Sequence, residues 1–328
     1  MVIAEGSPAP HGLRPADVRR DLHGIADLLA EAFSGELDEV GWRVIRELRR
    51  WSRLGWLLRG LEVFLPPGER FAPGYVWVEE GRIVGYTMVR RLRPGSTGWL
   101  IANVAVAPDF RRRGIARALV SACLDYARAH GARWAVLQVR ADNLPALRLY
   151  QGLGFVEIGR IRIWRREHLS PPEPTPVPGF HVRPARPTRD LSALLDLVRM
   201  AESPALRLFE PFEGLSAWPP GWPFRWRPRP LWLLETESGD PQALAAWVRR
   251  EGIPTLRLFR RPQTVPSPPL QWLLALALAE IAPGPPLMAV TGEEPDLAAA
   301  LMAAGFHPVR TLIGMRRDLA PEGWGDAG

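Results

Sequence analysis

Three consecutive arginines, Arg111–Arg113, stand directly before Gly114 at the start of an apolar-periodic segment. The first N–H groups of a helix have no intrahelical partner and the helix dipole is positive there, so an anion is stabilised at that end. Gly114 has no Cβ and lets a ligand approach the backbone, and the small Ala116 keeps the next contact open. Arginine adds charge in a geometry that suits phosphate. The segment therefore predicts a phosphate-binding turn, and a solvated helix start is the alternative.

The common phosphate-binding motifs do not account for this turn. No Gly-Lys-Ser or Gly-Lys-Thr sequence follows it, which excludes a P-loop, and the spaced glycine triplet of dinucleotide-binding folds is absent. What remains is Arg-x-x-Gly-x-Ala over residues 111–116, directly after the apolar run VAVAPDF.

The elements that must position this turn follow from hydrophobic periodicity. The predicted elements, in chain order, are helices over Arg20–Phe33 and Val40–Leu61, a hairpin turning at Glu79–Arg82, a strand from Trp99, a helix from Gly114 to Gly131, a strand from Arg133, a short helix in LPALRLYQGLG and a strand in FVEIGRIRIW. The apolar face of the helix after Gly114 is predicted to comprise Ile115, Leu119, Val120, Cys123, Leu124 and Ala127. Strand, helix and strand in direct succession need a parallel crossover. We therefore expect a mixed α/β fold, a mostly antiparallel sheet with a central parallel strand pair flanked by helices.

The residues that could do chemistry resemble those of a known family. RRRGIA at residues 111–116, after a buried strand, is similar to the pyrophosphate loop of the GNAT superfamily of acetyl-CoA-dependent N-acyltransferases. Asn143, the segment ALRLY ending at Tyr150, and the dipeptide at 154–155 resemble the family's second cofactor-contacting segment, in the family's order. The resemblance covers residues 13–168, and the expected order of elements is also that of the family.

The resemblance implies a role for each matched position. In a splay between the two parallel strands, the pantetheine arm of acetyl-CoA would pair with the backbone of Val104, Ala105 and Val106. The pyrophosphate would be held by Arg111, Arg112, Arg113, Gly114, Ile115 and Ala116. Asn143 would contact the cofactor arm, although an asparagine before a helix is also a favoured cap.

The resemblance implies that Tyr150 is the general acid. Because the ordinary tyrosine pKa of about 10 keeps the proton in place at neutral pH, the hydroxyl can donate it to the leaving thiolate. A tyrosine that only packs in or beside the core is the alternative. A backbone N–H near Val104 would hold the oxyanion of the tetrahedral intermediate.

The general base stays unassigned. A carboxylate near the end of the strand after Trp99 commonly takes this role in the family, and this sequence has Asn103 there, which cannot act as a base but can orient a water. Four acidic residues lie where such folds often recognise substrate, and solvent-facing side chains are the alternative: Glu31, Glu36, Asp38 and Glu39.

The chain repeats itself across a proline-rich spacer. SPPEPTPVPG, residues 170–179, is too rich in proline for a helix or a sheet ladder. LRPADVRRDLHGIADLL from Leu13 aligns with VRPARPTRDLSALLDLV from Val182, and GFVEIGRIRIWRRE from Gly154 aligns with GFHPVRTLIGMRRD from Gly305. We therefore expect a tandem duplication, with domains at 1–169 and 180–328 joined by the linker 170–179.

The second copy lacks the chemistry predicted for the first. TVPSPP at 264–269 replaces the arginine turn and has neither glycine nor arginine. Glu294 stands at the position of Asn143, and Leu301 at that of Tyr150. Residues 180–328 are therefore predicted to form a degenerate GNAT-like domain that packs on the first domain or shapes its substrate cleft.

The net charge of +7 is carried by arginine alone, because the chain has no lysine. Codon bias explains this pattern as well as chemistry does, so it is weak evidence for nucleic-acid binding. WPPGWPFRWRPRPLW from Trp218 interleaves aromatics and arginines as a single-stranded nucleic-acid surface can, but its prolines favour a rigid lid or interdomain loop. We expect no nucleic-acid partner.

Cys123, the one cysteine, occupies an apolar helical position and predicts a buried thiol in a cytoplasmic protein. The N-terminal residues show no signal-peptide pattern. The longest apolar run, from Leu273, is too short to span a membrane and contains Glu280. We expect no membrane partner and no metal.

These observations favour an acetyl-CoA-dependent N-acetyltransferase, an acyltransferase of the EC 2.3.1 type, that transfers an acetyl group to a primary amine by direct attack. The alternative is a non-catalytic acyl-CoA sensor or scaffold, which the missing carboxylate base supports. The acceptor is expected to be a small-molecule or peptide amine, and a homodimer is left open. The residues do not determine the acceptor, the acyl-chain preference or the role of the second domain.

Overall fold

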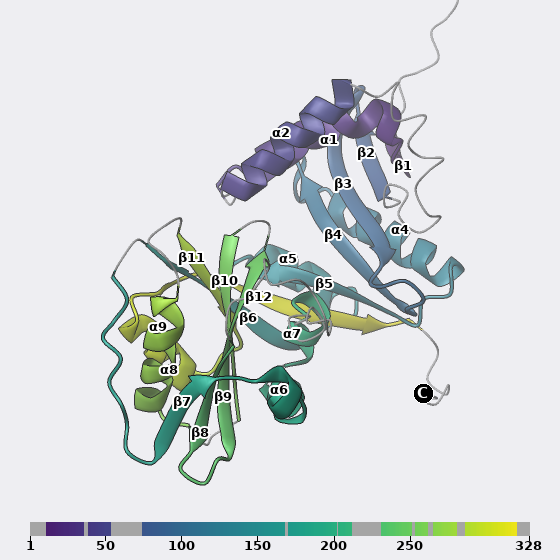
Figure 1. The fold of residues 1–328 in the computed structure, drawn as a ribbon. Coiled ribbons are helices and arrows are strands. Elements are labelled where there is room, and N and C mark those ends of the chain that lie inside the picture. The colour runs from purple at the N-terminus through teal and green to yellow at the C-terminus, as the bar shows by residue number, and fades with distance from the viewer. Residues whose placement is uncertain are drawn as a thin grey trace, which may run out of the picture. The chain divides into compact units, whose positions relative to one another are not determined.

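The computed structural model describes residues 11–35, 39–53, 74–167, 170–201, 203–211, 231–250, 253–261, 265–280 and 286–319. They form two compact units (Figure 1). Unit 1 takes its described residues from Met1–Gln138, Pro145–Val156 and Arg316–Gly328, and unit 2 from Val139–Leu144 and Glu157–Met315.

Unit 1 is a mixed sheet with helices. Its elements are β1 (Gly12–Pro15), α1 (Val18–Ala32), α2 (Glu39–Arg53), β2 (Gly74–Glu79), β3 (Arg82–Arg91), β4 (Gly98–Val106), a short 3₁₀ helix (Pro108–Phe110), α4 (Ile115–Ala129), most of β5 (Trp134–Arg140) and most of α5 (Leu144–Gln151). The strands follow the order β1-β2-β3-β4-β5, and the end of β12 lies beyond β5. Pairing is antiparallel up to β4 and parallel between β4 and β5. The expected central parallel pair is thus confirmed.

The helices of unit 1 form where apolar periodicity predicts them. The buried residues of α4 are the six that its 3.6-residue spacing indicates: Ile115, Leu119, Val120, Cys123, Leu124 and Ala127. α4 ends at His130, and Gly131 follows in the left-handed region. The second predicted helix begins one residue earlier than expected, at Glu39, and its predicted end at Leu61 lies outside the described residues.

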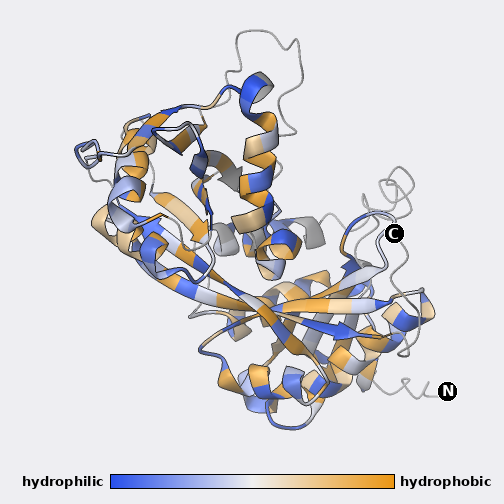
Figure 2. Cartoon of the chain, turned by 90° about the horizontal axis from the view of Figure 1, so that it is seen from below, coloured by the Kyte–Doolittle hydropathy of each residue, from blue (hydrophilic) through white to orange (hydrophobic). Residues whose placement is uncertain are grey.

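The core of unit 1 lies between its helices and the first strands. Ile25 and Leu28 of α1, Val76 of β2, Val84 of β3 and Leu119 of α4 belong to one buried cluster. In Figure 2, apolar and polar residues alternate along the helices, as expected of helices that bury one face against a core. This cluster anchors β3 and β4, the strands that lead into the arginine turn.

Unit 2 repeats the same plan. Its elements are most of β6 (Val156–Arg166), β7 (Phe180–Pro184), α6 (Pro187–Ala201), α7 (Pro204–Phe209), β8 (Trp232–Thr236), β9 (Pro241–Arg250), β10 (Ile253–Arg260), α8 (Ser267–Ala279), β11 (Leu287–Thr291), α9 (Pro295–Ala303) and most of β12 (His307–Asp318). The strand order is β12-β6-β11-β10-β9-β8-β7, and β10 and β11 are the parallel pair. Both units therefore have the mixed sheet that the duplication predicts.

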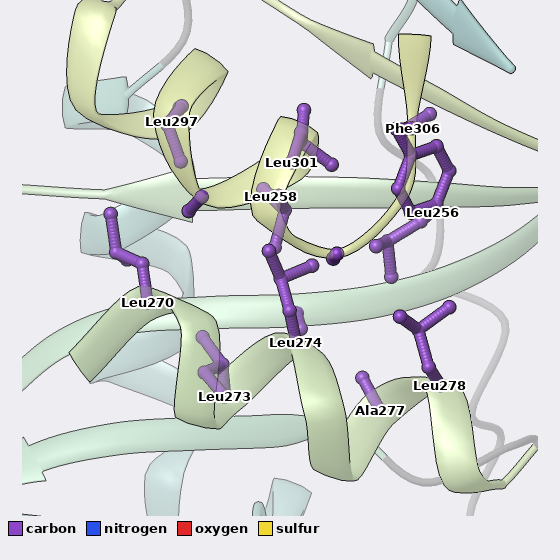
Figure 3. Packing of buried hydrophobic residues seen from close by; sticks show 14 of the residues in the cluster. Leu256, Leu258, Leu270, Leu273, Leu274, Ala277, Leu278, Leu297, Leu301 and Phe306 are labelled. Atoms are coloured by element: carbon purple, nitrogen blue, oxygen red, sulfur yellow. The ribbon is translucent and has the colours of Figure 1, made fainter. Parts of the chain in front are cut away.

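The core of unit 2 is packed by leucines. Figure 3 shows part of one buried cluster, to which Leu270 and Leu274 of α8, Leu301 of α9, and Leu256 and Leu258 of β10 contribute. Leu301, the counterpart of Tyr150, is fully buried in this cluster. The residue at this position is therefore part of the hydrophobic core of unit 2.

The last strand of the first half lies mostly in unit 2, and the last strand of the second half ends in unit 1. β6, from the first half of the duplicated sequence, pairs antiparallel with β11 in unit 2, with Arg166 opposite Leu287 and Arg162 opposite Thr291. The end of β12, from the second half, belongs to unit 1. The domain boundaries at 169 and 180 stay a prediction about the duplicated sequence, and the compact units are a different division. Residues 170–179 form neither helix nor strand.

Candidate active site

β4 and β5 separate after a short parallel ladder. The ladder joins Gly98–Leu100 on β4 to Trp134–Val136 on β5. β4 then continues to Val106, so its second half runs beyond the ladder. This is the splay between parallel strands that the resemblance implies for the pantetheine arm.

A bulge turns the second half of β4 so that its backbone groups face this splay. The pairing of β3 with β4 shifts register where Asn103 adopts a φ of +55°. The N–H of Ala107 donates to Val84 O on β3 at 2.8 Å. Because successive N–H groups along a strand point to opposite sides, the N–H groups of Val106 and Val104 point away from β3. They are donors on the edge where a cofactor arm would pair.

The arginine turn follows β4 directly. Arg111 donates from Nε to the Val106 carbonyl at 3.2 Å, which ties the turn to the end of the strand. Arg113 donates to Asp109 O at 3.1 Å and lies over the ring of Phe110. Arg112 adopts a φ of +61°, a costly conformation for a residue with a side chain. All three arginines are exposed, so their positive charge is accessible to an anion at the turn.

The N-terminus of α4 supplies further donors. Gly114 is its N-cap, with a φ of +80° and no side-chain capping bond. The first helical bond runs from Ala118 N–H to Gly114 O, so the N–H groups of Ile115, Ala116 and Arg117 have no partner within the helix. Open space lies where a Cβ on Gly114 would stand. The combination of donors, dipole and arginines fits a diphosphate.

Tyr150 lies on the last turn of α5. Its side chain is buried, and its ring meets Phe155 edge-on with the centroids 6.1 Å apart. Burial raises the pKa of Tyr150 to about 12. The hydroxyl therefore keeps its proton at neutral pH, as a general acid must.

Asn143 is exposed in the turn between β5 and α5, and its N–H donates to Arg140 O at 3.1 Å. This residue is assigned to unit 2, whereas Tyr150 is assigned to unit 1. Its contact with the cofactor stays a prediction.

The acidic residues near α1 are engaged elsewhere or lie outside the described part. Glu31 pairs with Arg82 at 2.7 Å. Glu36 and Asp38 lie outside the described residues, as does the side chain of Glu39. Asn103 donates from Nδ2 to the sulfur of Met88 at 3.2 Å. The general base is still unassigned.

Sequence reasoning missed a cavity of about 470 Å³ between α1 and the β2–β3 turn. Ion pairs such as Arg14 with Asp21 and Arg82 with Glu31 line it. No motif indicates it, because its walls come from two segments more than forty positions apart in the sequence.

In unit 2 an ion pair stands at the equivalent place. Arg260, at the end of β10, donates from Nε to Glu294 Oε2 at 2.5 Å, and its side chain is only 5% exposed. Glu294 is the N-cap of α9 and occupies the position that Asn143 has in the first half. The helix that follows β10 begins after Pro266 with no side-chain cap. The side chain at the position equivalent to Asn143 is thus engaged in an ion pair in unit 2.

Residues 25–155 match the model of the acetyltransferase (GNAT) family. This range contains the splay, the arginine turn and Tyr150. The chain therefore contains a domain of the GNAT superfamily. The GNAT match ends at Phe155, the residue that packs against Tyr150.

Two curated acetyltransferases match part of the chain. A mycothiol acetyltransferase of Corynebacterium glutamicum (strain R) is 33% identical over 125 residues, 38% of each chain. A [ribosomal protein bS18]-alanine N-acetyltransferase of Escherichia coli (strain K12) is 32% identical over 90 residues, 27% of this chain and 58% of the relative. The matches span less than two thirds of either relative.

Two solved structures share the fold over both halves. A GCN5-related N-acetyltransferase from Sphaerobacter thermophilus has a TM-score of 0.64 at 20% identity, over 95% of this chain and 97% of that one. A tandem GNAT protein from the clavulanic acid biosynthesis pathway has a TM-score of 0.51 at 18% identity, over 95% and 99%. The fold is thus that of a two-domain GNAT protein.

Two absences hold for the part of the chain that the structure describes. Within it, no helix is long and apolar enough to cross a membrane. The same residues contain no cluster of histidine, cysteine or acidic side chains suited to a metal ion. The loop from Trp218 lies outside the described residues up to Pro230.

Proposed function

We propose that the protein is an acetyl-CoA-dependent N-acetyltransferase with its site in unit 1. The observation that carries this proposal is the junction of β4 and α4, where an unpaired strand edge leads directly into an arginine-rich turn and an uncapped helix N-terminus. The backbone donors in this row, first at the strand edge and then at the helix N-terminus, suit a ligand with an amide-bearing arm at one end and a diphosphate at the other.

Each part of this row has a distinct task. The N–H groups of Ile115 and Ala116 would hold the diphosphate, with Arg111–Arg113 neutralising its charge. The outward N–H of Val106 would pair with the arm as an added strand does. Acetyl-CoA, when bound, supplies the acetyl thioester that an amine attacks.

Two groups of unit 1 would serve the chemistry. The outward N–H of Val104 stabilises the negative charge that develops on the thioester oxygen when an amine attacks. The hydroxyl of Tyr150 gives its proton to the sulfur as the bond between carbon and sulfur breaks. The acceptor amine loses a proton in the same reaction, through a base that these residues do not supply.

Calorimetry with acetyl-CoA tests the binding site. We expect the Gly114→Glu variant to bind on the order of 100-fold more weakly than wild type, because it adds a negative charge at the diphosphate and forces a side chain into the left-handed region. Gly131→Glu is the matched control, since Gly131 has the same φ of +80° and the same open surroundings at the other end of α4. If wild type does not bind acetyl-CoA, the proposal is wrong.

Release of free thiol in the presence of amines tests the chemistry. Tyr150→Phe is expected to lower kcat by about 10²-fold or more with little change in the KM for acetyl-CoA, since the hydroxyl acts in the transition state. Because the pKa of Tyr150 is raised to about 12, wild-type kcat is expected to show no loss from this group up to about pH 11. Tyr126→Phe, at the far end of α4, is the control.

A non-catalytic acyl-CoA sensor is the second candidate, and the occupation of the usual base position by Asn103 favours it. Both candidates bind acetyl-CoA, so only turnover separates them. Amine-dependent thiol release that falls in Tyr150→Phe eliminates the sensor, whereas binding without release across a broad panel supports it.

The acceptor panel begins with the classes that the relatives' names indicate. Those are acceptors related to mycothiol and peptides that begin with alanine. Small primary amines complete it. The acceptor with the highest kcat/KM assigns the substrate class.

A further inference from the structure

Unit 1 is completed by residues from the second half of the duplicated sequence. The N–H of Leu319 donates to Arg133 O at 2.8 Å. The guanidinium of Arg316 lies 4.9 Å from the ring centre of Trp134, the first residue of β5. The end of β12 is therefore fastened along the start of β5, inside the unit that carries Tyr150.

Unit 2 contains the reciprocal arrangement. Trp164 of β6 donates from Nε1 to Thr291 Oγ1 at 3.0 Å, and both residues are buried. Arg166, also on β6, donates from Nε to Ala304 O at 2.7 Å, at the turn between α9 and β12. An arginine from the first half thus holds a turn of unit 2.

Arg317 is the counterpart of Arg166 in the repeated segments that begin at Gly154 and Gly305. Its Nε lies 3.5 Å from the position that a Cβ on Gly154 would take. Gly154 has a φ of +81° in the turn that ends α5. The guanidinium of Arg317 therefore packs on this turn of unit 1, as Arg166 packs on the equivalent turn of unit 2.

Charged groups of α4 also face Arg317. Burial and the nearby Arg128 lower the pKa of Arg317, and Asp125 raises it. The guanidinium stays charged, because no such shift brings arginine near neutral pH. A cation thus lies against the turn after α5, under the electrostatic influence of charged side chains of α4.

The turn under Arg317 is bonded to Tyr150. The N–H groups of Leu153 and Phe155 both donate to the Tyr150 carbonyl at 3.0 Å. The Phe155 ring, which is 2% exposed, meets the Tyr150 ring edge-on. A shift of this turn must therefore move or loosen the tyrosine.

We propose that Arg317 is a positioning residue for acetyl transfer: the second half of the chain supplies it to unit 1, where it holds the turn at Gly154 and thereby fixes the Tyr150 ring. The kinetic part of this proposal rests on the proposed function of Tyr150 as the general acid. The proposal also assigns a role to the second half of the chain, which contributes a residue to the unit that contains Tyr150.

Fluorine NMR of the full chain labelled with 3-fluorotyrosine tests the positioning directly. The chain has four tyrosines, Tyr75, Tyr86, Tyr126 and Tyr150, and Tyr150→Phe identifies the resonance of interest. We expect Arg317→Ala to shift or broaden the Tyr150 resonance and to leave Tyr75 and Tyr86 unchanged.

Arg316→Ala is the matched control for this experiment, because the neighbouring side chain lies on Trp134 instead of the turn. It is expected to leave the Tyr150 resonance in place. An unchanged Tyr150 resonance in folded Arg317→Ala overturns the proposal. If Arg317→Ala does not fold, Arg317→Lys replaces it, since lysine keeps the charge but lacks the planar fork that packs on the turn.

Kinetics provide the second readout. Arg317→Ala is expected to lower kcat roughly tenfold, because a small displacement of a catalytic group is costly. The KM for acetyl-CoA should change by less than about twofold, because the residues of the arginine turn are untouched. Arg317→Lys should keep a higher kcat than Arg317→Ala. If Arg316→Ala lowers kcat as much as Arg317→Ala does, the loss reflects a general disturbance of β12 and contradicts a specific role of Arg317. If wild type transfers no acetyl group, the proposed function is wrong. The fluorine experiment would still test whether Arg317 positions Tyr150, because it does not depend on turnover.

Discussion

Arg14 holds Asp21 with both terminal nitrogens, at 2.6 and 2.7 Å. The same carboxylate accepts the N–H of Asp17 at 2.7 Å, which fixes the entry of α1. The second half repeats this arrangement, with Arg183 bonded to Asp190 at 2.7 and 3.1 Å and the N–H of Arg186 bonded to the same carboxylate. The duplication seen in the sequence is thus preserved in individual hydrogen bonds.

Loss of the Asp21 carboxylate is expected to destabilise the protein. Burial is the largest influence and raises the pKa of Asp21, but the bonds from Arg14 and from the Asp17 N–H together outweigh it and lower the pKa. A carboxylate with a lowered pKa stabilises the fold above its unfolded pKa and loses that effect as the pH falls through the folded pKa. Asp21→Asn should therefore cost about 2 kcal/mol of unfolding free energy at pH 7, and the difference from wild type should shrink below about pH 4.

Asp190→Asn is the comparison for that measurement. Arg183 also binds Glu235, at 2.9 Å, so it keeps an anionic partner when Asp190 is neutralised. The hydrogen bonds from Arg183 lower the pKa of Asp190. A smaller loss than for Asp21→Asn is expected in urea unfolding, and equal losses that do not depend on pH would contradict the role given to these ion pairs.

Unit 2 is expected to bind no acetyl-CoA. Calorimetry should give one site per chain, because the ion pair of Arg260 with Glu294 occupies the position that corresponds to the proposed place of the cofactor arm. Glu294→Gln should lower the unfolding free energy by about 3 kcal/mol, since it leaves the buried Arg260 without its main counter-charge. Glu294→Asn, which copies Asn143, should still give one site, and a second site in that variant would show that the ion pair alone excludes the ligand.

Cleavage of the linker is expected to leave the molecule whole. With a protease site placed within residues 171–178, cutting the folded chain should yield two fragments that elute together, because unit 2 contains β6 of the first fragment and unit 1 contains the end of β12 of the second. The melting temperature should stay close to that of the uncut variant. Cutting in denaturant is the control, and fragments that separate under native conditions would contradict this assignment of strands.

Cys123 is expected to be unreactive in the folded protein. Its side chain is fully buried, and burial raises the pKa of the thiol to about 12, with a smaller opposing effect from a hydrogen bond to Thr87. Because the thiolate is the reactive form, a thiol-specific reagent at pH 8 should modify the native chain at least about 100-fold more slowly than the denatured chain. Cys123→Ser sets the background, and rapid native modification would contradict the burial.

The local structure of the first half follows from its sequence. The 3.6-residue spacing from Ile115 to Ala127 marks the buried face of α4, and Gly114 marks its first turn, because both signals depend on neighbours a few positions away. The parallel pairing of β4 and β5 follows from a helix standing between two apolar strands. The bulge at Asn103 has no such signal, since a bulge depends on how many residues the partner strand provides.

The order of elements, the arginine turn, the duplication and the loss of the turn in the second copy can all be read from the sequence. Which strand pairs beside β5 and which beside β11 depends on tertiary contacts. β6 and β12 carry similar sequences, so hydrophobic pattern alone fits either of them beside β5 or beside β11, and pairing depends on where the rest of the chain brings them. The contact of Arg317 with Gly154, residues 163 positions apart in the sequence, exists because of that choice.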